Sequence, residues 1–251
     1  MATNKQAYAK GAQESKVRIY TNKQVDFIPE GEAYPSVTTI LSVISKPMLY
    51  VWYQQQGTTK ALILKEEFKI ALGPFWPQVE EWVEMKLPGS FWKCGQDLSD
   101  EAKSRGTMAH DAIDHWTKTG EWAYDKDVEN AISAFKQFVA EHEMKVLESE
   151  IALASNTFKY AGRTDIIAEL DGKLALLDIK TSSGFYPEMG LQLSAYKQAY
   201  KEMTGKIIEE LWIIRVDNRE GKLETKQYED DLSTFLGALA LWKGLRPKKK
   251  V

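Results

Sequence analysis

Apolar residues recur at helical intervals in the second half of the chain. After Ser99, apolar and small residues return every three or four positions, which is the pattern of a helix that buries one face. The recurring residues are Ala102, Gly106, Ala109, Ile113 and Trp116. Ser99 is a favourable N-cap and Gly120 a favourable stop, so we expect a helix between them.

The rest of this half alternates between helix-like and strand-like patterns. A second helix, with Ile132, Phe135 and Val139 on one face, is expected to end near Lys145. Later elements are expected as a strand at 146–154, a hairpin around 171–172, a helix at 187–203, a second hairpin at 206–228 and a closing helix at 231–242. This order predicts an α/β fold, in which helices flank a mixed central sheet that contains an antiparallel hairpin.

The first 95 residues show weaker patterns than the rest. Short strands are expected at 18–20 and 25–28, and Ser36 is a plausible N-cap for a helix at 37–44. A further helix is expected from Pro47 to Gln56, and an irregular surface excursion from Gly73 to Pro88. We therefore divide the chain into a mainly helical N-terminal region, 1–95, packed on a core, 96–251.

The hairpin around Asp171 and Gly172 is the most informative segment. Asp-Gly between two apolar runs indicates a two-residue turn, because a type I′ turn requires positive φ at both central positions. The pairs expected from this turn are Leu170 with Lys173, Ala168 with Ala175, and Ile166 with Leu177. If the pairing continues, Asp165 lies opposite Asp178, and Arg163 lies opposite Lys180.

This register would place two carboxylates and one amine together. Residues two apart on a strand share a face, so Asp178 and Lys180 project beside Asp165. Like charges in opposed positions destabilise a sheet, and a divalent metal with oxygen ligands would offset them. The alternative is an exposed strand with solvated carboxylates, since an Asp-x-Lys triplet often arises by chance. The hairpin alone leaves both interpretations open.

Two helices carry further candidates. Gln192 and Tyr196 are four residues apart and share one helix face, although an ordinary helix with a buried tyrosine would look the same. His110 has Gly106 one turn before it and Asp114 one turn after it. Gly106 would permit close approach of another backbone, and Asp114 would accept a hydrogen bond from the His110 ring. A core or surface histidine is the alternative.

Composition narrows the class of protein only slightly. The formal net charge is −3 and the pI is near 5.8, so the chain lacks the basic excess typical of nucleic-acid binding proteins. Cys94 is the only cysteine, which excludes an internal disulfide and a cysteine-held iron–sulfur cluster. No apolar run approaches the roughly 20 residues that span a bilayer, and no secretory leader is evident, so we expect a cytoplasmic protein without a membrane partner.

Four short motifs stand in a specific order along the chain. They are Arg105-Gly106-Thr-Met-Ala-His110, Gly162-Arg-Thr-Asp165, Asp178-Ile-Lys180 and Gln192-Leu-Ser-Ala-Tyr196. This set resembles the PD-(D/E)XK nuclease superfamily, and specifically its RecB-like branch. Residues 35–41 also resemble the opening segment of phage exonucleases and of the mitochondrial genome maintenance exonuclease. Asp114 stands where relatives often have Glu, and the four cysteines of the iron–sulfur members are missing.

The resemblance implies a restriction-endonuclease-like core and a specific set of site residues. The implied ligands of Mg²⁺ or Mn²⁺ are His110, Asp165, Asp178 and the Ile179 carbonyl. Asp165, Asp178 and Lys180 would be catalytic, with Lys180 orienting the attacking water or stabilising the developing charge. Gln192 and Tyr196 would brace the site or touch the DNA backbone. Arg163 is a candidate phosphate contact, or a simple surface arginine. Glu150, on the preceding strand, is a further candidate that we leave outside the ligand set.

These residues lead to a functional hypothesis. We expect a metal-dependent DNA nuclease, and by analogy an exonuclease that acts at single-stranded or duplex DNA ends in replication, recombination or repair. A bacterial or phage-infected cell, and a recombination or replication protein as partner, would fit that activity. The alternatives are a structure-specific endonuclease, a catalytically inactive DNA-binding module on the same fold, and a structural or adaptor protein.

Overall fold

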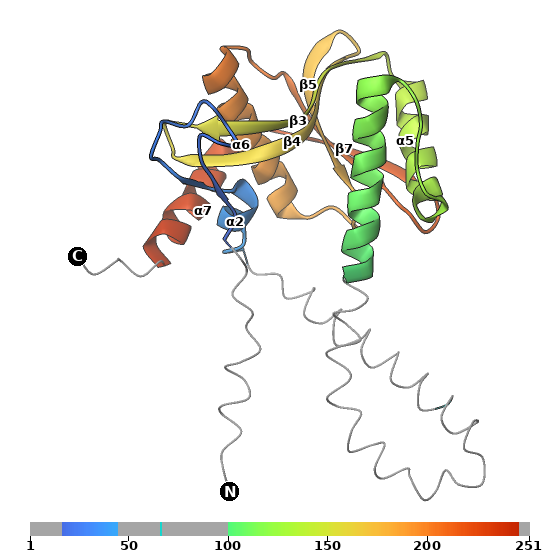
Figure 1. Cartoon of the computed structure of the whole chain (residues 1–251), viewed down its shortest axis with the longest axis horizontal. Helices are drawn as coiled ribbons and strands as arrows, with labels where there is room; N and C mark the ends of the chain where they lie inside the picture. Colours follow the sequence, from blue (N-terminus) through green and yellow to red (C-terminus); the bar gives the residue numbers. More distant parts are fainter. Residues whose placement is uncertain (1–16, 45–65, 67–99, 246–251) are drawn as a thin grey trace, which may run out of the picture.

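The structure, a computed structural model, describes residues 17–44, 66 and 100–245 (Figure 1). It confirms the predicted α/β class, with a five-stranded mixed sheet and a separate two-stranded antiparallel sheet flanked by helices. Three expectations lie outside the described residues: the helix at 47–56, the irregular surface excursion at 73–88, and the boundary at 95–96 between the N-terminal region and the core. None of the described helices is long and apolar enough to cross a membrane.

The five-stranded sheet follows the order of the chain. Its strands are β3 (Met144–Ser155), β4 (Tyr160–Leu170), β5 (Lys173–Lys180), β6 (Glu210–Val216) and β7 (Leu223–Tyr228). β5 and β6 pair in parallel and every other neighbouring pair is antiparallel. The parallel pair needs a crossover, which the chain supplies as the long helix α6 (Pro187–Thr204).

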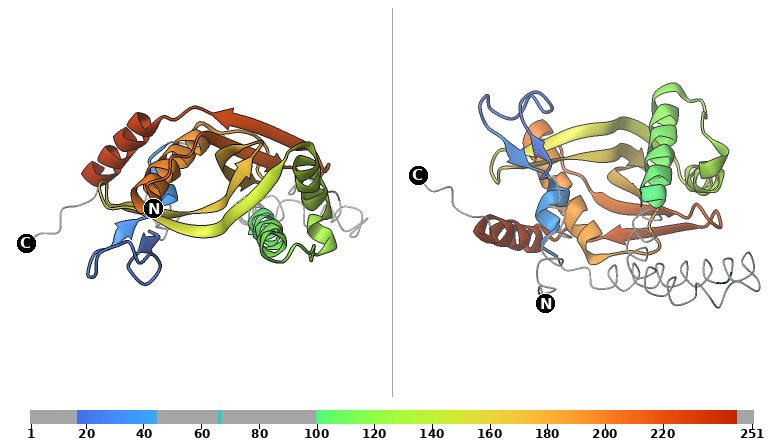
Figure 2. Two further views of the ribbon diagram at one scale, coloured as in Figure 1. Left: turned by 90° about the horizontal axis from the view of Figure 1, so that it is seen from above. Right: turned by 60° about the horizontal axis from the view of Figure 1, so that its bottom comes forward.

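Helices cover both faces of this sheet (Figures 1 and 2). On one face, α2 (Val37–Leu41), α6 and α7 (Leu232–Leu245) share a core with apolar residues of β3 to β6. On the other face, the helix at 100–119 and α5 (Glu129–Glu141), which follows the short η2 (Lys126–Val128), pack on the alternate residues of β4, β5 and β6. The site described below lies where side chains from both layers reach the sheet.

The predicted hairpin register is confirmed near the turn. Asp171 and Gly172 have φ values of 50° and 81°, and the pairs run from Leu170 with Lys173 to Ile166 with Leu177. The carboxylate of Asp171 also accepts hydrogen bonds from Glu143 N and pairs with His142 Nδ1, at 2.8 and 2.6 Å. The turn is therefore tied to the connection between α5 and β3.

Three boundaries differ from the expectation. α5 ends at Glu141 and not near Lys145, because Met144 and Lys145 pair with β4 as the start of β3. Residues 25–28 form turns, and the strand that pairs with β1 (Ile19–Tyr20) is β2 (Tyr34–Pro35). Ser36 does cap a helix, accepting a hydrogen bond from Thr39 N at 3.1 Å, but α2 is only five residues long.

Candidate metal and catalytic site

The site begins where β4 and β5 stop pairing. Their ladder ends at Ile166 and Leu177, so the predicted pairing of Asp165 with Asp178 does not continue. Instead, Oδ2 of Asp165 accepts a hydrogen bond from the backbone N–H of Ile179 at 2.7 Å. The prediction that Arg163 lies opposite Lys180 is wrong for the same reason, because neither residue takes part in the β4–β5 ladder.

Three side chains from three elements meet at this divergence. They are His110 from the helix at 100–119, Glu150 from β3 and Asp165 from β4, and one ligand atom of each lies within 4.8 Å of the others. Nδ1 of His110 is 3.4 Å from Oδ1 of Asp165. The structure therefore brings His110 to Asp165, as the sequence predicted, although the two are 55 residues apart in number.

Glu150 is a member of this cluster that the predicted ligand set left out. Its φ is 50°, an uncommon value for a residue with a side chain, and it falls in the middle of β3. The pairing of β3 with β4 is irregular just before it, between Val146 and Glu148. The distorted backbone is thus found where the Glu150 carboxylate lies beside Asp165. Backbone outliers of this kind occur often at functional sites. Arg163 forms an ion pair with Glu150 at 3.5 Å.

The Asp178 carboxylate is nearly inaccessible, at 1% exposed, and lies against Lys180. Its Oδ2 forms an ion pair with Lys180 Nζ, and its Oδ1 accepts a hydrogen bond from Gln192 Nε2 at 3.3 Å. Gln192 Nε2 also donates to the hydroxyl of Tyr196 at 3.0 Å. Asp178, Lys180, Gln192 and Tyr196 are thus brought together as predicted, and in contacts that link β5 to α6.

Burial and charge shift the acidity of these groups in opposite directions. The pKa of Asp178 is raised to about 6, because burial and then Asp165 raise it by more than Lys180 lowers it. Burial lowers the pKa of Lys180, but Asp178 and Asp165 outweigh it, so the net shift is upward. For Asp165, burial is outweighed by His110 and Lys180, so its pKa falls. Lys180 is therefore a cation at neutral pH, and Asp165 is an anion.

The His110, Glu150 and Asp165 cluster fits a divalent metal ion. Burial and the neighbouring Asp165 raise the pKa of Glu150 by more than His110 and Arg163 lower it, so a further cation beside this carboxylate would favour its charged form. The His110 pKa is lowered by burial but raised more by Asp165, so a proton on His110 offsets part of the negative charge. The two carboxylates offer oxygen ligands that suit both Mg²⁺ and Mn²⁺. The imidazole nitrogen suits Mn²⁺ better than Mg²⁺.

Asp114 does not orient His110, contrary to the expectation. Its Oδ1 accepts a hydrogen bond from Ser149 Oγ at 2.9 Å, and its Oδ2 pairs with Lys118 at 2.6 Å. Asp114 thereby holds the residue that precedes Glu150. Gly106 does allow another segment to approach the helix closely, as expected. The neighbouring atom belongs to a side chain and not to a backbone, since an added Cβ would lie 3.0 Å from Thr181 Oγ1.

Gly162 has a specific packing role beside Tyr196. A Cβ at this position would lie 2.4 Å from Cε1 of the Tyr196 ring, closer than side-chain atoms can come. The missing side chain thus lets the Tyr196 ring lie against β4, where its hydroxyl receives the Gln192 hydrogen bond.

We expect Gly162→Ala to destabilise the fold by about 1–3 kcal/mol, the usual cost of overpacking a buried site. Because the displaced ring also supports Gln192, the variant is expected to lower activity more than its loss of stability explains. Thermal melts and rates measured well below the melting temperature separate the two effects. A Gly184→Ala variant is the control, since its added Cβ meets nothing within 4 Å.

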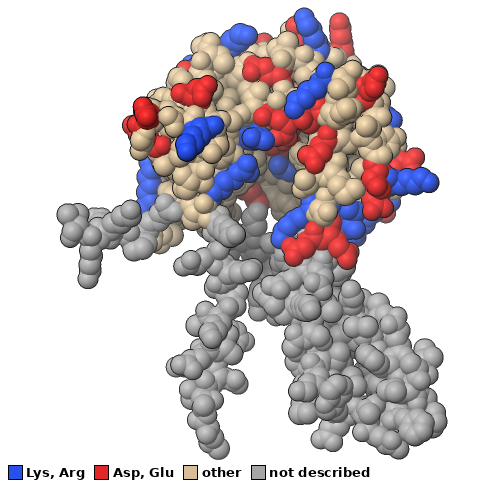
Figure 3. Space-filling model, in the orientation of Figure 1, with Lys and Arg blue, Asp and Glu red and all other residues tan. Residues whose placement is uncertain are grey.

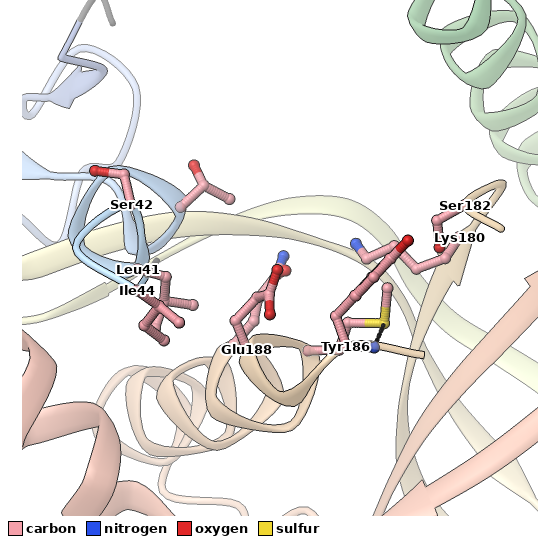
Figure 4. Close-up of a pocket in the computed structure, with 10 residues that line it drawn as sticks. Leu41, Ser42, Ile44, Lys180, Ser182, Tyr186 and Glu188 are labelled. Carbon is pink, nitrogen blue, oxygen red and sulfur yellow. Dashed lines mark hydrogen bonds between the residues drawn. The ribbon is translucent and has the colours of Figure 1, made fainter. Parts of the chain in front are cut away.

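A cavity of about 600 Å³ opens on the Lys180 side of the site (Figure 4). Figure 4 shows Lys180, Ser182 and Tyr186 on one side of it and Glu188, on α6, between the two sides. Leu41, Ser42 and Ile44, at and just after the end of α2, lie on the other side. Its lining residues are Thr38, Leu41, Ser42, Ile44, Lys180, Ser182, Tyr186, Glu188, Met189 and Gln192. On this face of the molecule, side chains of both signs surround a central hollow (Figure 3).

No known protein-family profile matches the chain, and no curated protein matches its sequence. An alkaline exonuclease from Laribacter hongkongensis has a similar solved structure, with a TM-score of 0.36 and 13% identity over 54% of this chain and 76% of that one. The solved structure of SSO0001 gives a TM-score of 0.31 and 15% identity over 47% of this chain and 58% of that one. At this level of similarity, neither likeness transfers residue roles or activity to the chain.

Proposed function

We propose that the chain is a metal-dependent nuclease that hydrolyses phosphodiester bonds in DNA. The observation that carries the proposal is the side-by-side placement of two groups of residues. One is the potential metal-binding cluster of His110, Glu150 and Asp165. The other is the buried ion pair of Asp178 and Lys180, which is close enough for Asp165 to influence the acidity of both members.

The metal would be held first by the cluster. His110, Asp165 and Glu150 each offer one atom, and Asp178 and the Ile179 carbonyl are the further ligands implied by the ordered motifs. A bound Mg²⁺ or Mn²⁺ ion supplies a water of lowered pKa and neutralises charge on the scissile phosphate. Hydrogen bonding of Asp165 to Ile179 N holds one carboxylate oxygen in place and leaves the other near His110.

Lys180 would act as a fixed positive charge. Its ammonium is protonated at neutral pH, because Asp178 and Asp165 raise its pKa above the ordinary value despite burial. It can therefore stabilise negative charge at the phosphate and orient the attacking water by donating a hydrogen bond. A protonated amine cannot remove a proton from that water. Asp178, supported by Gln192 and Tyr196, would hold the ammonium in place.

The finer assignment is an exonuclease that acts at DNA ends with Mg²⁺ or Mn²⁺. Its support is analogy, because residues 35–41 resemble the opening segment of phage exonucleases and of the mitochondrial genome maintenance exonuclease. Arg163 would contribute less to DNA binding than first expected, since its guanidinium pairs with Glu150. A catalytically inactive DNA-binding module is the second candidate, and the intact Asp178 and Lys180 pair argues against it, because a phosphate-binding surface has no need to bury a carboxylate under its cation.

Digestion of labelled DNA tests the proposed function. End-labelled single-stranded, duplex and circular DNA are each incubated with the protein and Mn²⁺, with chelator as the blank. We expect mononucleotides or short products from linear DNA and none from closed circles. Cutting of circles would replace the exonuclease with an endonuclease. Binding without metal-dependent product from any of these DNAs would identify the inactive module, and the nuclease assignment would be wrong.

Metal should also stabilise the folded protein. A ligand that binds only the native state raises stability by mass action, so Mn²⁺ at about 100 times its dissociation constant is expected to raise the Tm by about 5–10 °C. Glu150→Gln removes one charge of the cluster and is expected to reduce this shift, whereas Glu169→Gln, on the exposed part of β4, should leave it unchanged. An identical melt for the wild type with Mn²⁺ and with chelator would argue against the cluster as a metal site.

A further inference from the structure

The cavity beside Lys180 differs from a phosphate-binding pocket. Among the described residues that line it, Lys180 is the only cation, and Glu188 contributes a carboxylate. Four of the ten lining residues are apolar or aromatic, and hydroxyl and amide groups lie between them. The apolar and aromatic members are Leu41, Ile44, Tyr186 and Met189. A carboxylate repels phosphate, so this chemistry fits an uncharged flat group with polar edges, such as a nucleobase.

Tyr186 supplies a flat surface at the mouth of the cavity. It is 40% exposed, so part of its ring is open to contact from solvent. Its hydroxyl lies 3.2 Å from Ser183 Oγ, and its backbone N–H donates to Met189 Sδ at 3.4 Å, so the residue is held from both ends. Arg215 donates a hydrogen bond to the Ser182 carbonyl at 3.0 Å and thereby fixes the loop that carries this ring.

The cavity is continuous with the catalytic residues. Lys180 and Gln192 both line it, and both contact Asp178. If Lys180 faces the scissile phosphate, the nucleotide next to that phosphate must lie in or beside the cavity. The volume of about 600 Å³ is that of a pocket for a small organic ligand, which has room for a nucleotide unit but not for a duplex.

We propose that this cavity binds the unpaired base adjoining the scissile phosphate, stacked on Tyr186, so that the strand in the site is single-stranded DNA. The inference rests on the proposed nuclease function for its placement of the phosphate. Base–aromatic stacking is largely independent of sequence, since every base has a flat face. The strand would therefore be selected by its lack of pairing, and not by the identity of the base.

The test is binding of short single-stranded oligonucleotides in the presence of chelator, which needs no cleavage. The probes carry 2-aminopurine or an abasic site at successive positions. We expect Tyr186→Ala to weaken binding by about tenfold or more, and Tyr186→Phe to leave it within about twofold, because the ring remains. Tyr124→Ala is the matched control, since Tyr124 is 38% exposed and does not line the cavity. Ser42→Trp, placed to fill the cavity from α2, should weaken binding as well.

The position of the abasic site gives the sharpest outcome. When the abasic site is at the one oligonucleotide position that occupies the cavity, the wild type should bind more weakly. At that position the wild type and Tyr186→Ala should then bind with equal affinity. When cleavage is measured, the same variant should raise KM with little change in kcat. Equal binding by wild type, Tyr186→Ala and Ser42→Trp would overturn the inference, even if the protein cuts DNA. Base-dependent binding through Tyr186 without any cleavage would sustain the pocket and overturn the proposed nuclease function.

Discussion

Lys180→Ala is expected to lower the rate of DNA cleavage by about 10²–10³-fold, the usual loss when a positioned charge or donor at a reacting centre is removed. The substitution leaves Asp178 buried without its cation, so the pKa of Asp178 should rise further above the present value of about 6. The rate is measured under single-turnover conditions with saturating Mn²⁺, so that weaker metal binding does not disguise the loss.

Two variants make this prediction specific. Lys173→Ala removes an exposed lysine from the opposite end of the same strand, where it pairs with Glu210 at 2.7 Å, and should cut DNA at the wild-type rate. Lys180→Arg keeps the charge but changes its shape, and should recover only part of the loss. A Lys180→Ala protein that is folded and cuts within a few-fold of wild type would remove Lys180 from the catalytic residues.

Asp165→Asn is expected to have the second large effect, chiefly on metal binding. Asp165 is the member of the cluster that contacts His110, and it also accepts the Ile179 hydrogen bond, which an asparagine oxygen can still accept. Substitution of a residue that only hydrogen-bonds to a metal ligand typically weakens metal affinity by about 10–100-fold. Asp165 is a proposed ligand itself, so the loss of its charge should weaken Mn²⁺ affinity by more than this. Calorimetric titration with Mn²⁺ measures the affinity, and high Mn²⁺ should restore part of the activity.

The matched control is a second histidine–aspartate pair elsewhere in the fold. His142 and Asp171 are 2.6 Å apart at the β4–β5 turn, and Asp171→Asn removes that pair without touching the cluster. It should lower stability slightly and leave Mn²⁺ affinity unchanged. If Asp165→Asn bound Mn²⁺ as tightly as the wild type, the cluster would not be the metal site.

The local parts of this site could be predicted from sequence because short-range physics controls them. The Asp171-Gly172 turn requires positive φ at both positions, which fixed the hairpin register as far as Ile166 and Leu177. Periodicity likewise placed His110 on a helix with one apolar face, and the four-residue spacing placed Gln192 beside Tyr196. Each of these follows from neighbours within a few residues.

The remaining parts depend on contacts between distant segments. The β4–β5 ladder ends at Ile166 and Leu177, whereas β5 continues to Lys180 in its pairing with β6, a strand that follows a whole helix in the chain. Glu150 reaches the cluster through a positive φ that no alternation of apolar and polar residues reveals. The cavity joins α2 to α6, two elements about 150 residues apart, so its lining could not be read from any one segment.

The most direct test of the account is the rate of nucleotide release from end-labelled single-stranded DNA across a Mn²⁺ titration. The account predicts no release with chelator. For wild type and Lys173→Ala, the rate should rise with Mn²⁺ and saturate. For Asp165→Asn the same rise should require higher Mn²⁺, and for Lys180→Ala the rate should saturate at a low value. Release that is independent of metal, or that is the same for all four proteins, would contradict it.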